Sequence, residues 1–200
     1  MLFVASPDYK PFVILGLVGV SVIAVAVFGL SQLDASQLGV RGARILAWLD
    51  PEAYASGKGF QTLQALYAIG SGGIFGKGLG QSMQKLGFLP ETQNDMIFSI
   101  VCEELGLFGG IAIILMFLLL IWRFMIIANN ASDLFGALLV VGVLGHIAIQ
   151  VILNIAVVTN TIPNTGISLP FISYGGSSVL FLLIEIGLVL SVARGINISE

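Results

Sequence analysis

The protein has 200 residues, of which 57% are hydrophobic and only 10% are charged. Soluble domains carry roughly 25% charged residues, and the core of a soluble domain of this size could not bury so much apolar surface. The net charge is −3, and the eight lysines and arginines are scattered along the chain. Nucleic-acid binding calls for a basic face or stripe, so no nucleic-acid partner is expected. The one cysteine, Cys102, excludes an internal disulfide.

Four apolar stretches are long enough to cross a bilayer as helices, which takes roughly 20 residues each. They cover residues 12–33, 96–127, 134–158 and 172–193. The first stretch is too long for the apolar part of a signal peptide, so it is interpreted as a retained helix. The pattern predicts an all-α polytopic membrane protein with about four transmembrane helices in a single membrane domain over residues 1–200.

The distribution of basic residues predicts the orientation. Lys10, Arg123 and Arg194 flank the ends of the four stretches that would share one side of the membrane, whereas the short loop over residues 159–171 has no lysine or arginine. Because basic residues of short loops stay in the cytoplasm, both termini are predicted to be cytoplasmic. The long loop over residues 34–94 is then extracellular.

This extracellular loop does not have the composition of a disordered segment. Residues 45–49 form an apolar run that Pro51 ends, and residues 60–69 place apolar side chains near helical spacing. Such helices lie along the membrane interface or re-enter the lipid. The loop is therefore predicted to be folded and partly helical.

Residues 70–80, which we call the glycine segment, raise the question of a phosphate loop. The Walker A spacing fails, because Ser71 stands at the first glycine position and Gly78 follows Lys77 where Ser or Thr is required. A turn that lets two backbones approach closely is the preferred interpretation. An anion nest of N–H groups for a lipid pyrophosphate stays open as an alternative.

The densest polar cluster covers residues 85–95 and ends at Asp95, directly before the apolar run that starts at Met96. Aspartate is among the best helix N-caps and stabilises a helix by about 1 kcal/mol in that position. A carboxylate at the outer membrane face is also a candidate for catalysis. From spacing alone, both interpretations of Asp95 stay open.

Ionisable residues inside the predicted spans are functional hypotheses, because a charge in lipid is unfavourable. They are Glu103, Glu104, His146 and Glu185. Glu103 follows Asp95 by eight residues, so both can face one side of a helix. Glu104 and Glu185 each need a partner that the sequence does not identify.

A polar stripe runs along the third predicted span. His146, Gln150 and Asn154 recur every four residues and therefore share one helix face. For Gln150 and Asn154, hydrogen bonding between helices is the preferred interpretation.

Three stretches together resemble the SEDS family, the membrane glycosyltransferases typified by FtsW, RodA and SpoVE. They are residues 68–80, residues 84–106 and Leu-Pro-Phe-Ile-Ser-Tyr-Gly-Gly-Ser-Ser over residues 169–178. Members of the family have about ten spans, and this chain resembles the last four with their large extracellular loop. The resemblance thus implies the C-terminal part of a SEDS fold, beginning just ahead of the seventh span.

The resemblance also implies a function, namely polymerisation of lipid II into glycan strands during cell division, elongation or sporulation. Such an enzyme acts on the outer face of the bacterial cytoplasmic membrane, with a class B penicillin-binding protein as partner. Asp95 matches the family's essential aspartate and is the expected catalytic base. Its neighbours Gln93, Asn94 and Met96 differ from the family's His-Thr-Asp-Phe-like stretch.

Other residues are assigned to the substrate. Lys85, with Lys77 or Arg44 as further candidates, would neutralise the pyrophosphate, as could a divalent metal such as Mg²⁺ or Mn²⁺. Glu91 is a candidate for orienting the acceptor or binding the metal. Two alternatives stay open: a lipid II flippase or transporter, which glycine-rich breaks and intramembrane acids favour, and a non-catalytic scaffold for a transpeptidase.

Overall fold

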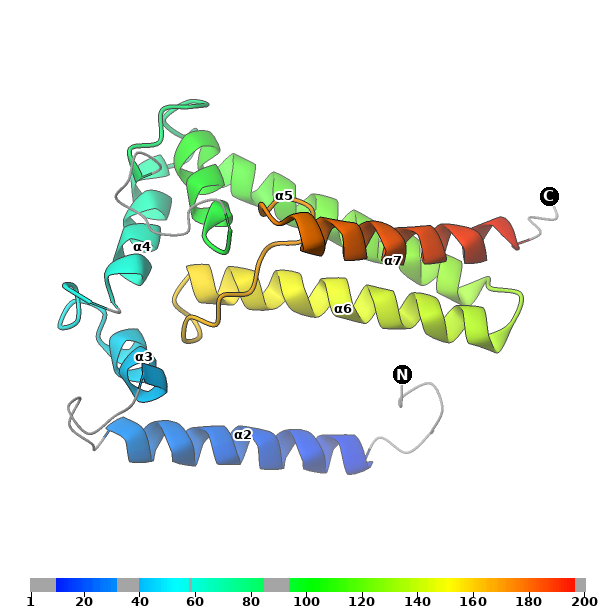
Figure 1. Ribbon diagram of the computed structural model, residues 1–200, viewed down its shortest axis with the longest axis horizontal. Helices are drawn as coiled ribbons and strands as arrows, with labels where there is room; N and C mark the ends of the chain where they lie inside the picture. Colours follow the sequence, from blue (N-terminus) through cyan, green and yellow to red (C-terminus); the bar gives the residue numbers. More distant parts are fainter. Residues whose placement is uncertain (1–9, 32–39, 58, 85–93, 197–200) are drawn as a thin grey trace. The chain divides into compact units, whose positions relative to one another are not determined.

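The computed structural model of the protein describes residues 10–31, 40–57, 59–84 and 94–196. All regular secondary structure in these ranges is helical (Figure 1), which confirms the predicted all-α class. The helices are α2 (Lys10–Ser31), α3 (Val40–Leu49), α4 (Phe60–Gly72), α5 (Ile97–Asn129), α6 (Leu134–Val158) and α7 (Gly176–Arg194).

The chain divides into two compact units, residues 1–63 and 64–200. In the first unit α2 contacts α3. Helix α3 ends at Leu49, shortly before Pro51, because proline cannot continue a helix that has already begun. The next turn is held by Asp50, whose Oδ1 accepts a hydrogen bond from the N–H of Ala53 at 3.1 Å. Helices α3 and α4 confirm that the long loop is partly helical.

The second unit contains the long helices α5, α6 and α7, which pack side by side (Figure 1). A short connection joins α5 to α6, and Asp133 caps α6 by accepting a hydrogen bond from the N–H of Gly136 at 3.1 Å. The apolar side chains buried between the helices include Phe98, Ile113, Phe117, Val140, Ile147, Leu182 and Val189.

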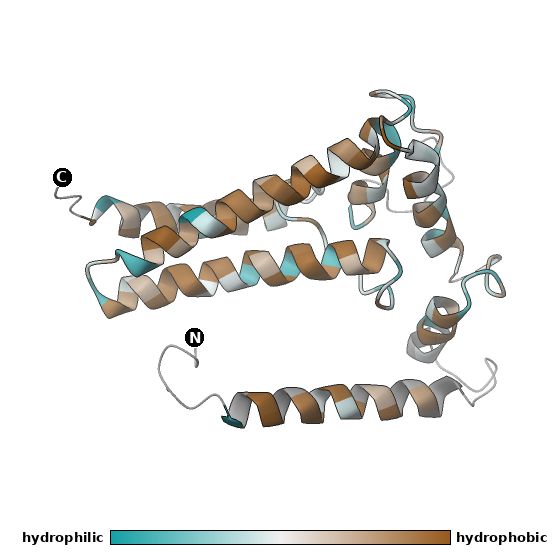
Figure 2. Ribbon diagram, turned by 180° about the vertical axis from the view of Figure 1, so that it is seen from behind, coloured by the Kyte–Doolittle hydropathy of each residue, from teal (hydrophilic) through white to brown (hydrophobic). Residues whose placement is uncertain are grey.

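All three of these helices are long and apolar enough to cross a membrane. Figure 2 shows that apolar residues cover most of their length. Many large side chains, such as Leu115, Leu119 and Phe181, are exposed on the outside of the bundle. This arrangement is stable where the surroundings are lipid, because helices bond most of their backbone polar groups internally and the apolar side chains meet acyl chains. The first stretch predicted to span, residues 12–33, largely coincides with α2, and its membrane crossing stays a prediction.

Helix α7 begins at Gly176, four residues after the start of the predicted span. The residues before it form a turn in which the Ser173 hydroxyl accepts from the N–H of Leu169 at 2.7 Å and the Ser173 N–H donates to Leu169 O at 3.0 Å. Phe171 lies inside this turn with a φ of 63°. The serine side chain thus supports a non-helical backbone, which apolar periodicity alone does not reveal.

Helix α5 is interrupted at Gly106, whose φ of 68° and ψ of −164° are not helical. The carbonyls of Glu103 and Glu104 would normally accept from N–H groups four residues later in the helix. Here they accept instead from the N–H groups of Lys77 and Gly78 in the glycine segment, each at 2.9 Å.

The N–H groups that the break in α5 leaves free also bond to the glycine segment, in an exchange of hydrogen bonds between the two backbones. The N–H groups of Leu107 and Phe108, which the interruption of α5 frees, donate to Gly73 O at 2.9 Å and Ile74 O at 3.4 Å. Four hydrogen bonds to the glycine segment therefore take the place of two bonds inside α5. A break at membrane depth is tolerated only when the freed backbone groups find partners in the protein, and the glycine segment supplies those partners.

Glycine is required where the two backbones meet. A Cβ at Gly72 would overlap the carbonyl of Cys102, and a Cβ at Gly76 would overlap the carbonyl of Glu104. A Cβ at Gly106 would in turn overlap the backbone of the glycine segment. The predicted close approach of two backbones is thus confirmed.

The alternative interpretation of this segment, an anion nest, is wrong for its central part. The N–H groups of Gly76, Lys77 and Gly78 donate to carbonyl groups of the protein, those of Gly72, Glu103 and Glu104 respectively. Because each N–H is already bonded, the three cannot form a concave cradle for a phosphate.

Replacing Gly106 by alanine is expected to destabilise the fold. The backbone conformation of Gly106 is accessible essentially to glycine alone and costs other residues roughly 1–3 kcal/mol, before the overlap with the glycine segment is counted. Gly106→Ala should therefore lower the midpoint of thermal unfolding in detergent, followed by circular dichroism.

Gly145→Ala is the matched control, since a Cβ at Gly145 in α6 would meet nothing within 4 Å. Alanine is favoured over glycine inside a helix by up to about 1 kcal/mol, so this variant should unfold at an equal or higher temperature. Equal midpoints for the two variants would contradict the structural role given to Gly106.

Candidate functional site

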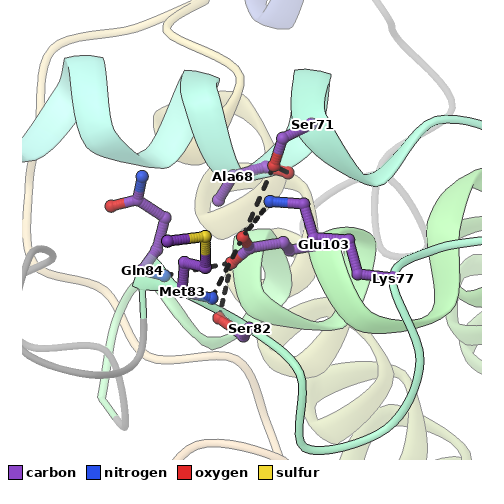
Figure 3. A network of polar contacts seen from close by, with 7 residues as sticks. All are labelled: Ala68, Ser71, Lys77, Ser82, Met83, Gln84 and Glu103. Atoms are coloured by element: carbon purple, nitrogen blue, oxygen red, sulfur yellow. Dashed lines mark hydrogen bonds and ion pairs between the residues drawn. The ribbon is translucent and has the colours of Figure 1, made fainter.

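The side chain of Glu103 is the centre of a buried polar network at the break in α5. Its exposed fraction is 0%. Figure 3 shows that the residues around Glu103 come from the end of α4, from the glycine segment and from the residues that follow it. The Nζ of Lys77 lies 2.7 Å from Oε1, and the hydroxyls of Ser71 and Ser82 donate to Oε1 and Oε2.

Two main-chain groups complete the network. The N–H of Met83 donates to Glu103 Oε1 at 3.3 Å, and the N–H of Gln84 donates to Oε2 at 3.4 Å. A carboxylate buried in this way is stabilised by its cation and by several donors at once. The side chain of Glu103 therefore holds residues 71–84 in place, while its main chain takes part in the exchange described above.

Lys77 has a partner within the protein. The sequence assigned Lys77 to the substrate pyrophosphate, yet its Nζ is paired with Glu103 and its side chain is 32% exposed. The pairing uses the ammonium to compensate a buried carboxylate. A role for Lys77 at the substrate stays a prediction. The serines of the network, Ser71 and Ser82, were missed, because isolated serines in a glycine-rich stretch carry no spacing signal.

Asp95 lies in the turn before α5 and is 7% exposed. The N-cap position of α5 is occupied by Met96, without a side-chain cap, so the interpretation of Asp95 as N-cap does not hold. A Cβ built on Gly166 would lie 3.9 Å from Asp95 Oδ2, which places the carboxylate beside the loop between α6 and α7. A candidate base is thus held close to a second loop.

Asn154 of α6 connects these two loops. It is completely buried, and its Nδ2 donates to Asp95 O at 2.8 Å and to Ile167 O at 2.7 Å. The sequence predicted hydrogen bonding between helices for this residue. The structure confirms the hydrogen bonding, but the acceptors are main-chain carbonyls in the turn before α5 and in the loop before α7.

An open pocket of about 500 Å³ lies where α5 and α7 begin. Ile97 lines it from α5, and Ser173, Tyr174, Gly175 and Gly176 line it from the other side. The pocket starts two residues after Asp95 and is bordered by the motif over residues 169–178. Asp95 itself is not among the residues that line the pocket.

A second polar contact lies midway along α6 and α7. His146 Nδ1 is 2.9 and 3.0 Å from the two carboxylate oxygens of Glu185. The partner of Glu185 that the sequence did not identify is therefore His146. The sequence singled out both residues as ionisable groups inside the spans. It could not pair them, because they lie 39 positions apart and their contact depends on how the helices pack.

Three further residues were assigned to the substrate from the sequence. Lys85 and Glu91 lie outside the described residues. Arg44 is exposed on α3 in the first unit. Among the described residues, no three His, Cys, Asp or Glu side chains are grouped so that they could hold a metal ion. These residues do not by themselves fit a divalent metal, and no chemical step is assigned to one.

The fold and the site define a polytopic helical membrane protein with a broken span that a glycine-rich loop braces. The sequence model of the FtsW, RodA and SpoVE family, described as cell cycle protein, matches residues 1–197. The chain belongs to this family, which is the SEDS family that its motifs resemble.

Relatives of known name support the same assignment. The chain is 48% identical over 194 residues to stage V sporulation protein E of Bacillus subtilis, covering 97% of the chain and 51% of the relative. It is 42% identical over 197 residues to the probable peptidoglycan glycosyltransferase FtsW of Coxiella burnetii, covering 96% of the chain and 50% of the relative. The chain thus spans about half the length of these relatives.

Two solved structures of similar fold support the family assignment. A chain of a peptidoglycan synthase complex, studied for the coordination of polymerization and crosslinking, matches with a TM-score of 0.69 and 27% identity, over 94% of this chain and 50% of that chain. A variant of the rod shape determining protein RodA of Thermus thermophilus matches with a TM-score of 0.52 and 34% identity, over 66% of this chain and 40% of that chain.

The pairing of Glu103 with Lys77 can be measured by a double-mutant cycle. Glu103→Ala leaves the ammonium and several donors without their acceptor, so a large loss of stability is expected. Adding Lys77→Met to this variant should restore part of the lost stability, and the interaction free energy of the two residues should be about 1–3 kcal/mol. The measurement is unfolding in mixed detergent micelles. Glu52→Gln, at an exposed glutamate, should change nothing, and additive effects of the two single variants would show that the pair is not coupled.

Removal of Asn154 should loosen the turn that carries Asp95. Asn154→Ala leaves the carbonyls of Asp95 and Ile167 without this donor, and a buried unsatisfied group costs about 1–3 kcal/mol. Faster backbone hydrogen exchange is therefore expected in residues 94–98 and 164–168, measured by mass spectrometry. Gln150→Ala, one turn away on the same face of α6, should leave exchange in both segments unchanged.

Proposed function

We propose that the chain forms the C-terminal part of a SEDS peptidoglycan glycosyltransferase, which polymerises lipid II into glycan strands. The observation that carries the proposal is the placement of Asp95, a shielded carboxylate held beside a second loop. Support also comes from relatives named as probable peptidoglycan glycosyltransferases that share more than 40% of their residues with the chain over the matched length.

Asp95 acts as the general base in this proposal. Its carboxylate takes the proton from a sugar hydroxyl of the acceptor, and the hydroxyl oxygen attacks the anomeric carbon of the donor. A new carbon–oxygen bond forms as the bond to the lipid pyrophosphate breaks. The leaving group departs as an anion and needs no second acid, in contrast to the pair of carboxylic acids in glycoside hydrolases. Attack opposite the leaving group converts an α-linked donor into a β-linked product.

The surrounding residues have supporting roles. Asn154 positions the main chain of Asp95, and the Glu103 network keeps the glycine segment against α5. Lys85, Lys77 and Arg44 remain candidates for compensating the pyrophosphate charge, and Glu91 remains a candidate for orienting the acceptor. In the proposed membrane topology, both termini are cytoplasmic and the site lies on the outer face. A class B penicillin-binding protein then crosslinks the product.

The base is tested in a complete ten-span protein, made by joining residues 1–200 to the N-terminal half of the Bacillus subtilis relative. Asp95→Asn should reduce the rate of lipid II polymerisation in liposomes by roughly 10²-fold or more, because general-base catalysis contributes factors of that size. Asp133→Asn is the control, since asparagine caps a helix as well as aspartate does, and it should retain full activity. A normal rate for Asp95→Asn would falsify the assignment.

The same liposomes separate the alternative functions. A flippase would move fluorescent lipid II between leaflets without forming polymer, and that movement would depend on Glu104 and Glu185 rather than on Asp95. A scaffold would bind the transpeptidase equally well with either residue at position 95 and form no polymer itself. Polymer that depends on Asp95 supports the glycosyltransferase and contradicts both alternatives.

A further inference from the structure

The glycine segment turns large apolar side chains outward. Ile74, Phe75 and Leu79 are 59%, 82% and 75% exposed. Bulky apolar groups gathered in a short loop are rarely left in water, and such a patch marks contact with a protein or with a membrane. The surface of the segment therefore requires an apolar neighbour.

The polar groups of the same segment are directed inward. Lys77 is the one ionisable residue between positions 70 and 84, and its ammonium is bonded to Glu103. The N–H groups of Lys77 and Gly78 and the carbonyls of Gly73 and Ile74 are bonded to α5. Because these donors, acceptors and the charge are used internally, these groups lose little hydration where the segment meets lipid.

The apolar surface of the segment continues onto the membrane-facing surface of α5. The ring of Phe75 lies against the ring of Phe108, with centroids 5.5 Å apart. Phe108, Leu107 and Ile111 are themselves exposed on this helix, which is apolar enough to cross a membrane. The surface that α5 offers to lipid thus extends without interruption onto the glycine segment.

The length of α5 indicates how deep in the membrane the apolar surface of the glycine segment lies. Arg123 and the exposed Trp122 are the kind of residues that mark a membrane boundary. Gly106 precedes Arg123 by 17 residues, which corresponds to about 26 Å of helix. The hydrocarbon core is about 30 Å thick, so Gly106 and Phe108 lie close to the opposite boundary. Phe75, which contacts Phe108, lies at the same depth.

We propose that the glycine segment is a lipid anchor, with Ile74, Phe75 and Leu79 inserted among acyl chains just below the headgroups. The occupant of its apolar surface is the bilayer itself. Since the same segment is bonded to α5 around Gly106, the anchor fixes the depth at which α5 begins, and with it the height of Asp95 above the lipid. The anchor does not depend on the identity of the reaction.

The anchor is tested by spin labels on the full chain reconstituted in phosphatidylglycerol and phosphatidylethanolamine vesicles. Single cysteines replace Phe75 or Leu79 in a Cys102→Ala background. Leu115→Cys, on the exposed face of α5, is the lipid reference, and Ser132→Cys, in the loop between α5 and α6, is the water reference. Power saturation then compares collisions with oxygen, which dissolves in lipid, and with a nickel chelate, which stays in water.

Labels at positions 75 and 79 are expected to show an oxygen-to-nickel ratio several-fold above that at Ser132 and approaching that at Leu115. A ratio equal to that at Ser132 would mean that the segment lies in water, and the proposal would be wrong. Low collision rates with both reagents would mean that protein, such as a second copy of the chain, covers the segment, which also overturns it. Circular dichroism confirms that each variant retains its helices.

Discussion

The structure depends on one constraint, that backbone groups freed by a break in a membrane helix must find partners in the protein. Gly106 interrupts α5, and the glycine segment supplies both the donors and the acceptors that the interrupted helix lacks. Glycine at positions 72, 76 and 106 lets the two backbones come close enough for these bonds. The buried carboxylate of Glu103 then holds the residues around the exchange through Lys77 and several further donors.

This brace connects the membrane part of the molecule with its candidate chemistry. Asp95 precedes α5, so its position depends on where that helix begins and on how firmly the helix is held. Asn154 adds a second support from α6, because one side-chain amide binds the turn of Asp95 and the loop before α7 together. A rigid supporting shell of this kind suits a single base that must meet an acceptor hydroxyl within hydrogen-bond distance.

The candidate site could be predicted only in part. The cluster before Met96 and the acids inside the spans stood out because charge in an apolar chain is rare, and Asp95 and Glu103 were both found in this way. The partners of Glu103 and Glu185 could not be found, since they depend on contacts 19 to 39 positions apart in the chain. Lys77 shows the same limit: its charge indicated a substrate contact, and the packing shows an ion pair with Glu103.

The amino-acid sequence was enough to predict an all-α membrane protein with a partly helical loop, because helix length and apolar content follow directly from the composition of each stretch. It also determined the family, since three motifs stand in order over most of the chain. Three features could be seen only in the three-dimensional fold: α5 is broken, the glycine segment completes it, and α7 begins after a turn held by Ser173. Those features arise from hydrogen bonds between distant backbones and from single side chains, which hydropathy and periodicity do not record.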